Sequence, residues 1–209
     1  MNPAFRTSTV ALSLLIALAW LIASVVFPAD QAALALGFIP ARLSGADFPW
    51  PAVPAVLTPL SSAFVHAGAL HIGFNLLIFV YCGLAVERIL GRTGLIALFV
   101  VGAYAAAIAQ WLPDRMGVVP MIGASGAVSA VIGACSLSFG RAKRVTNSPR
   151  LNRWINVVWL LAAWVVMQLM MGWLAGAQGY LLATPAHIGG FIAGLLLQRP
   201  LLLWRYRKA

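Results

Sequence analysis

The sequence predicts an all-α polytopic membrane protein, folded as one bundle of six transmembrane helices over residues 1–209. Of its 209 residues, 62% are hydrophobic and only 9% are charged, whereas about a quarter of the residues of a soluble domain are charged. Long hydrophobic segments recur through the chain, and a helix of about 20 apolar residues spans a bilayer. Lipid offers the backbone no hydrogen bonds, and the alternation typical of barrel strands is absent, so these segments are expected to be helices.

The first half of the chain holds three expected spans. The first, at about 8–27, is apolar over the length of a bilayer core. The connection 28–65 contains six prolines, which exclude one continuous helix, and its apolar and aromatic residues predict short helical pieces in the headgroup region. The second and third spans, at about 69–90 and 94–112, are separated by a short basic and glycine-containing stretch.

The second half holds three more expected spans. The fourth, at about 123–139, is short, so its first residues are expected to lie below the membrane surface. A basic connector leads to the fifth, at about 154–174, and an uncharged glycine-containing loop, 175–184, leads to the sixth, at about 185–203. Irregular backbone such as that preceding the fourth span is tolerated at membrane depth only beside a water-filled cavity.

The distribution of positive charge predicts the orientation. Six spans place both termini on one side, and if that side is the cytoplasm, it receives all of the 14 basic residues except Arg42 and Arg115. Cytoplasmic loops are enriched in Lys and Arg, so we expect both termini inside. The net charge of +10 then reflects membrane topology, and nucleic acid is not an expected partner. We expect a multi-pass protein of the cell's inner (plasma) membrane.

Polar residues from three separate spans are expected to meet near the outer face. In this orientation the second, fourth and sixth helices all run from outside to inside. His71 and Asn75 lie early in the second helix, Ser125 at the start of the fourth and His187 early in the sixth. His71 and Asn75 are four apart and share one helix face, where they either face a polar cavity or join helices. Taken alone, a serine in such a helix more often bonds to its own backbone.

Small residues are expected to bring Ser125 and His187 together. The two stripes are Ser125, Ser129 and Gly133 on the fourth helix and Gly190 and Gly194 on the sixth. Such stripes allow close helix contact. A serine with a base in hydrogen-bond reach is nucleophilic, and the free N–H groups of a helix's first turn form half of an oxyanion hole. The chain's four acidic residues lie elsewhere, so a serine–histidine dyad is expected.

No metal or other cofactor is expected. The sequence lacks H-E-x-x-H, and His66 and His71 are five apart, a poor spacing for one helix face. His66 is expected to bond within a loop. Cys82 and Cys135 lie in apolar segments without the spacing of a disulfide framework or a metal site, so we expect small buried side chains.

These residues resemble the rhomboid family of intramembrane serine proteases. The similarity lies in Gly123-Ala124-Ser125-Gly126, in His66-x4-His71-x3-Asn75 and in Ala186-His187-x2-Gly190-x3-Gly194, each in the corresponding helix. Ala85-Val86-Glu87-Arg88 with Gly91 also resembles the end of the family's second helix. The resemblance runs from about residue 61 to 198 and implies a minimal six-helix rhomboid-like bundle.

The resemblance implies a serine endopeptidase that cuts transmembrane segments of other membrane proteins, within lipid and toward the outer face. It implies that Ser125 is the nucleophile and His187 the general base, and that His71 and Asn75 join the Ser125 backbone in holding the oxyanion. The loop 175–184 would cap the site. Structural roles are implied for His66, Glu87, Gly123, Gly126, Gly190 and Gly194.

Two positions depart from the family pattern. Many members have an aromatic residue where this chain has Ser129, so either Ser129 bonds His187 or the histidine is held less firmly. The first loop has Leu57-Thr58 where many members have a Trp-Arg pair. The alternative function is that of a relative that binds and escorts membrane proteins without cutting them, although such relatives generally lack the dyad. A transporter is not supported, because no inverted repeat and no mid-membrane charge is visible.

Overall fold

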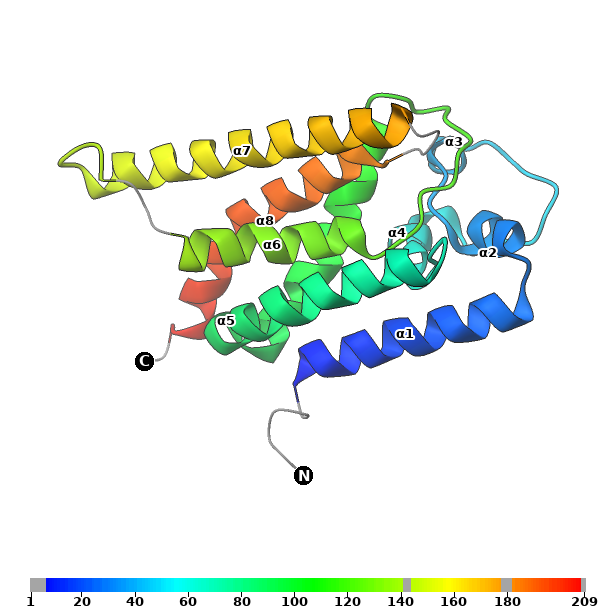
Figure 1. Cartoon of the computed structure of the whole chain (residues 1–209), viewed down its shortest axis with the longest axis horizontal. Helices are drawn as coiled ribbons and strands as arrows, with labels where there is room; N and C mark the ends of the chain where they lie inside the picture. Colours follow the sequence, from blue (N-terminus) through cyan, green and yellow to red (C-terminus); the bar gives the residue numbers. More distant parts are fainter. Residues whose placement is uncertain (1–6, 141–143, 178–181, 208–209) are drawn as a thin grey trace.

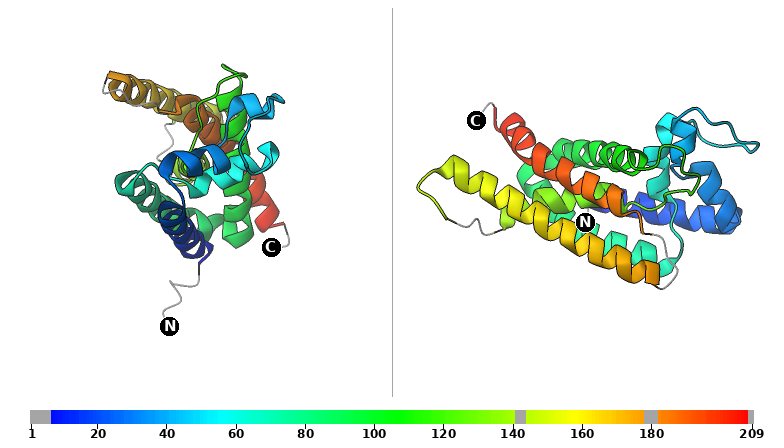
Figure 2. Two further views of the ribbon diagram at one scale, coloured as in Figure 1. Left: turned by 90° about the vertical axis from the view of Figure 1, so that its right-hand side faces the viewer. Right: turned by 90° about the horizontal axis from the view of Figure 1, so that it is seen from above.

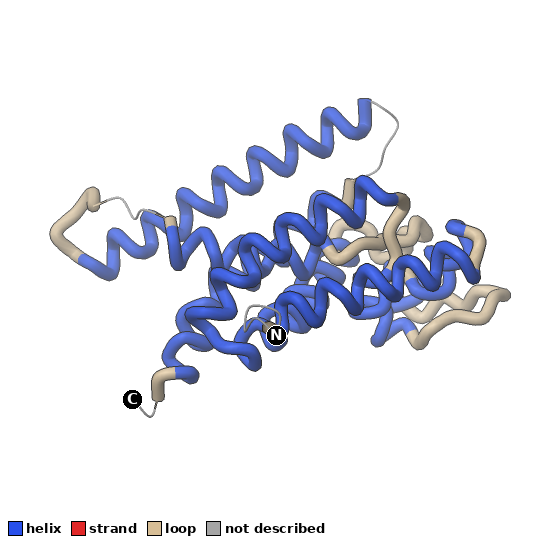
Figure 3. The backbone as a smooth tube through the Cα atoms, turned by 60° about the horizontal axis from the view of Figure 1, so that its bottom comes forward, coloured by secondary structure: helices blue, strands red, loops and turns tan. Residues whose placement is uncertain are grey.

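Helices account for all the regular secondary structure in the part of the chain that the computed structural model describes, residues 7–140, 144–177 and 182–207 (Figure 3). The long helices are α1 (Ser8–Val26), α5 (Ala69–Trp111), α6 (Ser125–Phe139), α7 (Pro149–Ala177) and α8 (Thr184–Arg205). The connection after α1 contains the predicted short pieces: α2 (Ala29–Leu36), α3 (Pro40–Leu43), η2 (Ala55–Leu57), α4 (Thr58–Ser61) and η3 (Ser62–Phe64).

The helix α5 is broken at Gly91. This residue has φ 76° and ψ 174°, a positive φ that glycine adopts without steric cost. The break divides the 43-residue helix into two arms where the sequence predicted two spans. Arg205, at the end of α8, donates from Nη1 to the carbonyl oxygen of Arg88 at 2.7 Å, which satisfies a backbone acceptor freed at the break.

Four helices of the described chain are long and apolar enough to cross a membrane: Ser8–Val26, Ala69–Trp111, Pro149–Trp173 and Thr184–Arg205. The helix α6 is apolar but has only 15 residues. Two bounds differ from those the sequence predicted. The helix α7 already begins at Pro149, because proline is well accommodated in a helix's first turn. The helix α8 continues through Pro200 to Arg205, as is tolerated where neighbouring groups satisfy the backbone.

The helix α6 lies at the centre of the bundle, packed against α5 and α8, whereas α1 and α7 lie at the edges (Figures 1 and 2). The outer surface is apolar; Leu70 and Trp173, for example, are 79% and 77% exposed. Among the residues of α7 whose side chains are described, only Asn156 and Gln168 are buried. The helix therefore presents apolar side chains outward and turns two amides inward, which is the arrangement of a helix bathed in lipid.

Glycines let the backbones of α6 and α8 touch. A Cβ atom added to Gly190 would lie 2.0 Å from the carbonyl oxygen of Gly126, and one added to Gly194 would lie 2.0 Å from that of Ala130. From the other side, a Cβ on Gly133 would lie 2.5 Å from the carbonyl oxygen of Phe191. No larger residue fits at these positions without a shift of the backbone. The contact therefore sets the position of α8 along the axis of α6.

Glu87 joins α1 to α5. Its Oε1 accepts from the Ser8 N–H at 2.7 Å, and its Oε2 accepts from the Thr9 N–H at 2.9 Å and from the Thr9 hydroxyl at 2.7 Å. These are groups of the first turn of α1, which have no partner within their own helix. The carboxylate also lies at the positive end of that helix's dipole, so it caps α1 from a neighbouring helix.

The connection 28–65 holds the segment that enters α6. Phe38 and Met121 exchange backbone hydrogen bonds of 2.9 and 2.8 Å, and the Gly123 N–H donates to the Ser62 carbonyl at 2.9 Å. The residues just before Ser125 are therefore fixed by backbone pairing with a segment far away in the sequence.

Replacing Gly194 by alanine is expected to destabilise the protein by about 1–3 kcal/mol, because the new methyl group collides with the backbone of α6. The control is Gly73→Ala, since a Cβ at Gly73 meets nothing within 4 Å and alanine favours a helix. Unfolding in detergent measures both. Equal stability of the two variants would contradict close backbone packing of α6 on α8.

Candidate active site

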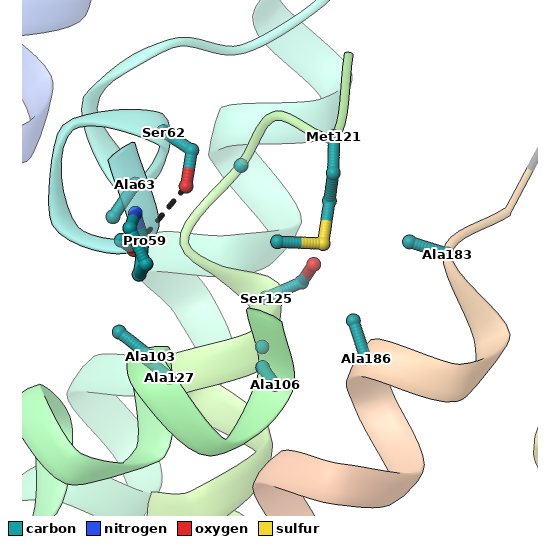
Figure 4. Close-up of a pocket in the computed structure, with 12 residues that line it drawn as sticks. Pro59, Ser62, Ala63, Ala103, Ala106, Met121, Ser125, Ala127, Ala183 and Ala186 are labelled. Atoms are coloured by element: carbon teal, nitrogen blue, oxygen red, sulfur yellow. Dashed lines mark hydrogen bonds between the residues drawn. The ribbon is translucent and has the colours of Figure 1, made fainter. Parts of the chain in front are cut away.

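Ser125 is the first residue of α6 and lines a small cavity (Figure 4). Gly123, two residues earlier, has φ 106° and lets the chain turn sharply into the helix. No side chain caps the N-terminus of α6. The backbone N–H groups of the first turn are therefore available to a negatively charged group, which the helix dipole also favours.

The side chains of Ser125 and His187 are hydrogen-bonded. The distance between Ser125 Oγ and His187 Nε2 is 2.8 Å, and His187 is buried near the start of α8. The close packing of α6 on α8 produces this contact, because Gly190, one turn after His187, lies against the carbonyl of Gly126. The structure thus brings together the serine and the histidine that the sequence analysis paired.

A third residue, Gln168 of α7, lies on the far side of His187. Its Oε1 is 2.8 Å from His187 Nδ1, and the side chain is 6% exposed. An amide oxygen only accepts, so Nδ1 carries the imidazole proton and Nε2 presents its lone pair to the serine hydroxyl. The structure therefore contains a hydrogen-bonded series of three side chains from three helices.

The sequence analysis missed Gln168, although a signal for it exists. It is an amide inside the apolar fifth span, and polar residues within a membrane span face a partner or a cavity. Trp164, one turn earlier on the same face of α7, donates from Nε1 to the His187 carbonyl at 3.2 Å and stacks on Phe191 with ring centroids 4.7 Å apart. These two residues attach α7 to the start of α8.

Ser129 does not bond to His187 in this structure. Its hydroxyl donates to the carbonyl oxygen of Ser125, one turn earlier, at 2.7 Å. The second ring nitrogen of His187 is instead bonded to Gln168. The hydrogen bond from Ser129 to His187 that the sequence allowed is therefore absent, and a residue of a different helix contacts the second ring nitrogen.

The two other histidines lie beside the entry to α6. His66 Nε2 accepts from the Ala124 N–H at 3.3 Å. Burial, and then the neighbouring His71, lower the pKa of His66 to about 3, so it is neutral and able to accept this bond. His71 Nδ1 accepts from the Ala67 N–H at 3.4 Å, so the protonated nitrogen of His71 is Nε2.

Gly123 separates His71 from Ser125. A Cβ atom at this position would lie 2.7 Å from His71 Nε2 and 3.8 Å from Ser125 Oγ. The missing side chain therefore leaves open the space between an N–H donor and the serine hydroxyl. That is where a group with developing negative charge next to Ser125 would find a donor.

Asn75 lies one turn after His71 on the same helix and is buried. Its Nδ2 donates to the His71 carbonyl oxygen at 2.9 Å. The second N–H of the amide makes no hydrogen bond with a residue that the structure describes. Asn75 thus stabilises the helix turn that carries His71, and one N–H of its amide has no acceptor among the described residues.

The cavity at Ser125 holds about 10 Å³, room for about one water molecule. Met121, Ala183 and Ala186 surround the serine hydroxyl in Figure 4. The predicted cap, 175–184, lies partly outside the described residues, since 178–181 are not among them.

The two cysteines lie outside this site. Cys82 and Cys135 are free thiols whose side chains meet between α5 and α6. Over the described part of the chain, no group of three or more His, Cys, Asp or Glu residues has the arrangement of a metal site.

Comparison with known proteins identifies sequences that are similar to this chain. The family model described as the Rhomboid domain matches residues 54–204. The chain is 36% identical over 139 residues to the Rhomboid protease GlpG of Serratia proteamaculans and 32% identical over 139 residues to that of Yersinia pestis. It is 28% identical over 144 residues to RHOMBOID-like protein 5 of Arabidopsis thaliana. The matches cover 66–69% of this chain but only 43–45% of the relatives, so the chain spans about half their length.

Proposed function

Because this chain belongs to the rhomboid family, we propose that it is an intramembrane serine endopeptidase that hydrolyses peptide bonds in or near transmembrane segments of other membrane proteins. The observation that carries the proposal is the 2.8 Å contact between Ser125 Oγ and His187 Nε2, in a chain related to proteins named as rhomboid proteases. A serine so placed beside a neutral imidazole is an activated nucleophile.

The first step is attack of Ser125 Oγ on the carbonyl carbon of the substrate peptide bond. The hydroxyl proton passes to His187 Nε2 as the new C–O bond forms. The Nδ1–H of the resulting imidazolium remains bonded to Gln168 Oε1, which holds the ring in place. His187 then gives its proton to the leaving amine, and an acyl group stays on Ser125. Water, giving a proton to the same histidine, then attacks the acyl carbon; the bond to Ser125 Oγ breaks, His187 returns the proton to that oxygen, and the second product leaves as an acid.

As Ser125 attacks, negative charge develops on the carbonyl oxygen of the substrate, and hydrogen-bond donors stabilise it. The proposed donors are the backbone N–H of Ser125, the Nε2–H of His71 and the unused N–H of Asn75. Support comes from the open space that Gly123 leaves between His71 Nε2 and Ser125 Oγ. Preorganised donors of this kind act strongly in a site from which water is excluded.

The proposed topology has six crossings, with both termini in the cytoplasm and Ser125 near the outer face of the inner (plasma) membrane. The two arms of α5 supply the second and third crossings, and the short α6 supplies the fourth. The ends of α5, α6 and α8 that carry His71, Ser125 and His187 then share one depth. The arginines of the opposite end face the cytoplasm, as the positive-inside rule expects.

A serine-reactive fluorophosphonate is expected to label the wild-type protein in detergent and to leave Ser125→Ala and His187→Ala unlabelled. Cleavage of a membrane-anchored reporter in liposomes is expected to be lost in both variants. Ser24→Ala serves as the control, because the Ser24 hydroxyl bonds only to its own helix at the exposed edge of the bundle. If a membrane protein co-purifies equally with wild type and Ser125→Ala and neither cuts it, the escort function replaces the protease.

Replacing Gln168 by leucine is expected to slow labelling about tenfold, because the Nδ1–H of His187 is left buried without an acceptor. Gln168→Glu keeps the acceptor and adds charge that stabilises the imidazolium, so the rising limb of the pH–rate profile is expected to shift to higher pH. Met167→Leu, on the exposed face of the same helix, is the control. An unchanged rate and profile in both Gln168 variants would exclude a positioning role.

Replacing Gly123 by alanine is expected to lower labelling and cleavage about 100-fold, the effect of losing one oxyanion donor. The new methyl group would occupy the space beside His71 Nε2. Gly45→Ala is the matched control, since Gly45 also has a positive φ, of 92°, so alanine strains the backbone there too, while a Cβ at Gly45 meets nothing within 4 Å. Similar activity of the two variants would show that the space next to Gly123 is not used by the substrate.

A further inference from the structure

A second and larger hollow lies at the end of the bundle away from Ser125. It has a volume of about 910 Å³ and lies between the last turns of α6, the first turns of α7 and the last turns of α8. In Figure 1 the end of α6, the start of α7 and the end of α8 all lie toward the left, whereas α6 begins, with Ser125, at its right-hand end. We call this hollow the basal cleft.

Three arginines line the basal cleft: Arg144, Arg153 and Arg199. The charges of Arg153 and Arg199 are close enough to repel each other. None of the three makes an ion pair or a hydrogen bond with the part of the chain that is described. The chain has only four acidic residues; Glu87 caps α1, and the other three lie in α2 and in the connections on the Ser125 side. Within the described residues, no side-chain carboxylate therefore neutralises this cluster.

The side-chain amide of Asn156, which has no partner among the described residues, is a candidate donor to a ligand in the cleft. Asn156 lines the cleft and is only 6% exposed, yet it has no hydrogen bond to a described residue. The amide atoms of Asn156 are not among the fully enclosed unpaired groups of the described chain, so the amide reaches the space of the cleft, where a ligand can bond to it. The other buried side chain described on α7, Gln168, has its partner in His187. Asn156 is its counterpart at the opposite end of the helix and faces the cleft instead.

Hydrogen bonds hold the segments that form the walls of the basal cleft. Asn152 Oδ1 accepts from the N–H groups of Val145 and Thr146 at 3.0 and 2.8 Å, and its Nδ2 donates to the Thr146 carbonyl. Between α6 and α8, Gln198 Nε2 donates to Ser138 Oγ at 3.1 Å. The arginines are thus carried by a preformed recess rather than by a loose basic tail.

We propose that the basal cleft binds a phosphate group, with the guanidinium groups of Arg153 and Arg199 and the amide of Asn156 as its donors. Guanidinium forks match phosphate oxygens in geometry and charge, and a bound phosphate would relieve the repulsion between the two arginines. The same chemistry is offered by the head group of an anionic phospholipid and by a soluble phosphate compound. Basic recesses between transmembrane helices bind lipid head groups in this way.

The proposal does not depend on the proteolytic activity. None of the residues that line the cleft belongs to the Ser125, His187 and Gln168 series or to the cavity around it. A change in the cleft is therefore tested by binding, with the labelling of Ser125 as an independent measure of folding.

The experiment is native mass spectrometry of the full chain in a non-ionic detergent, with a short-chain phosphatidylglycerol, a short-chain phosphatidylcholine and inorganic phosphate as probes. Phosphatidylglycerol is expected to bind the wild type, and its affinity is expected to fall about tenfold or more in Arg153→Gln/Arg199→Gln. The matched control is Arg150→Gln/Arg207→Gln, which removes the same charge from residues that do not line the cleft. The control is expected to bind as the wild type does.

A second variant is independent of arginine removal. Asn156→Asp keeps the shape of the side chain, and its carboxylate can pair with Arg153 and Arg199, so the variant is expected to fold and to lose phosphatidylglycerol binding. Competition by inorganic phosphate would assign the site to soluble phosphates, and its absence to the lipid. Equal losses in the two arginine variants, equal binding of both lipids, or undiminished binding by Asn156→Asp would each overturn the proposal.

Discussion

The contact between the backbones of α6 and α8 is the constraint on which the rest of the site depends. Without side chains at Gly190 and Gly194, the two helices approach until carbonyl groups and Cα atoms touch, and at that distance α8 has one register against α6. That register places His187 opposite Ser125 at 2.8 Å. In lipid, where apolar side chains gain little from leaving the solvent, such close packing is a principal source of helix association.

The helix α7 adds much less packing but two specific hydrogen bonds to one residue of α8. Gln168 contacts the ring of His187, while Trp164 donates to the backbone carbonyl of the same residue. The position and rotation of α7 therefore decide whether Nδ1 of His187 has a hydrogen-bond acceptor.

The loop that leads into α6 shows how distant segments build one site. Its backbone pairs with residues 38 and 62 of the long connection, and His66 accepts from Ala124. The proline-rich connection therefore holds the start of the helix that carries Ser125, a role that its sequence did not suggest. Likewise, three of the arginines that the charge pattern explained as topology signals, Arg144, Arg153 and Arg199, lie around one recess with Asn156.

The sequence by itself determined the class of protein, its family and the identity of the polar residues that meet. Hydrophobic length, charge distribution and small-residue spacing are local properties that can be read along one chain, and they suffice for a membrane bundle with Ser125 near His187. They could not reveal Gln168 as the partner of His187, the hydrogen bond of Ser129 to its own helix, or the open space that Gly123 leaves between His71 and Ser125. Those depend on the rotation of α7 and on the path of a loop, which only packing in three dimensions decides.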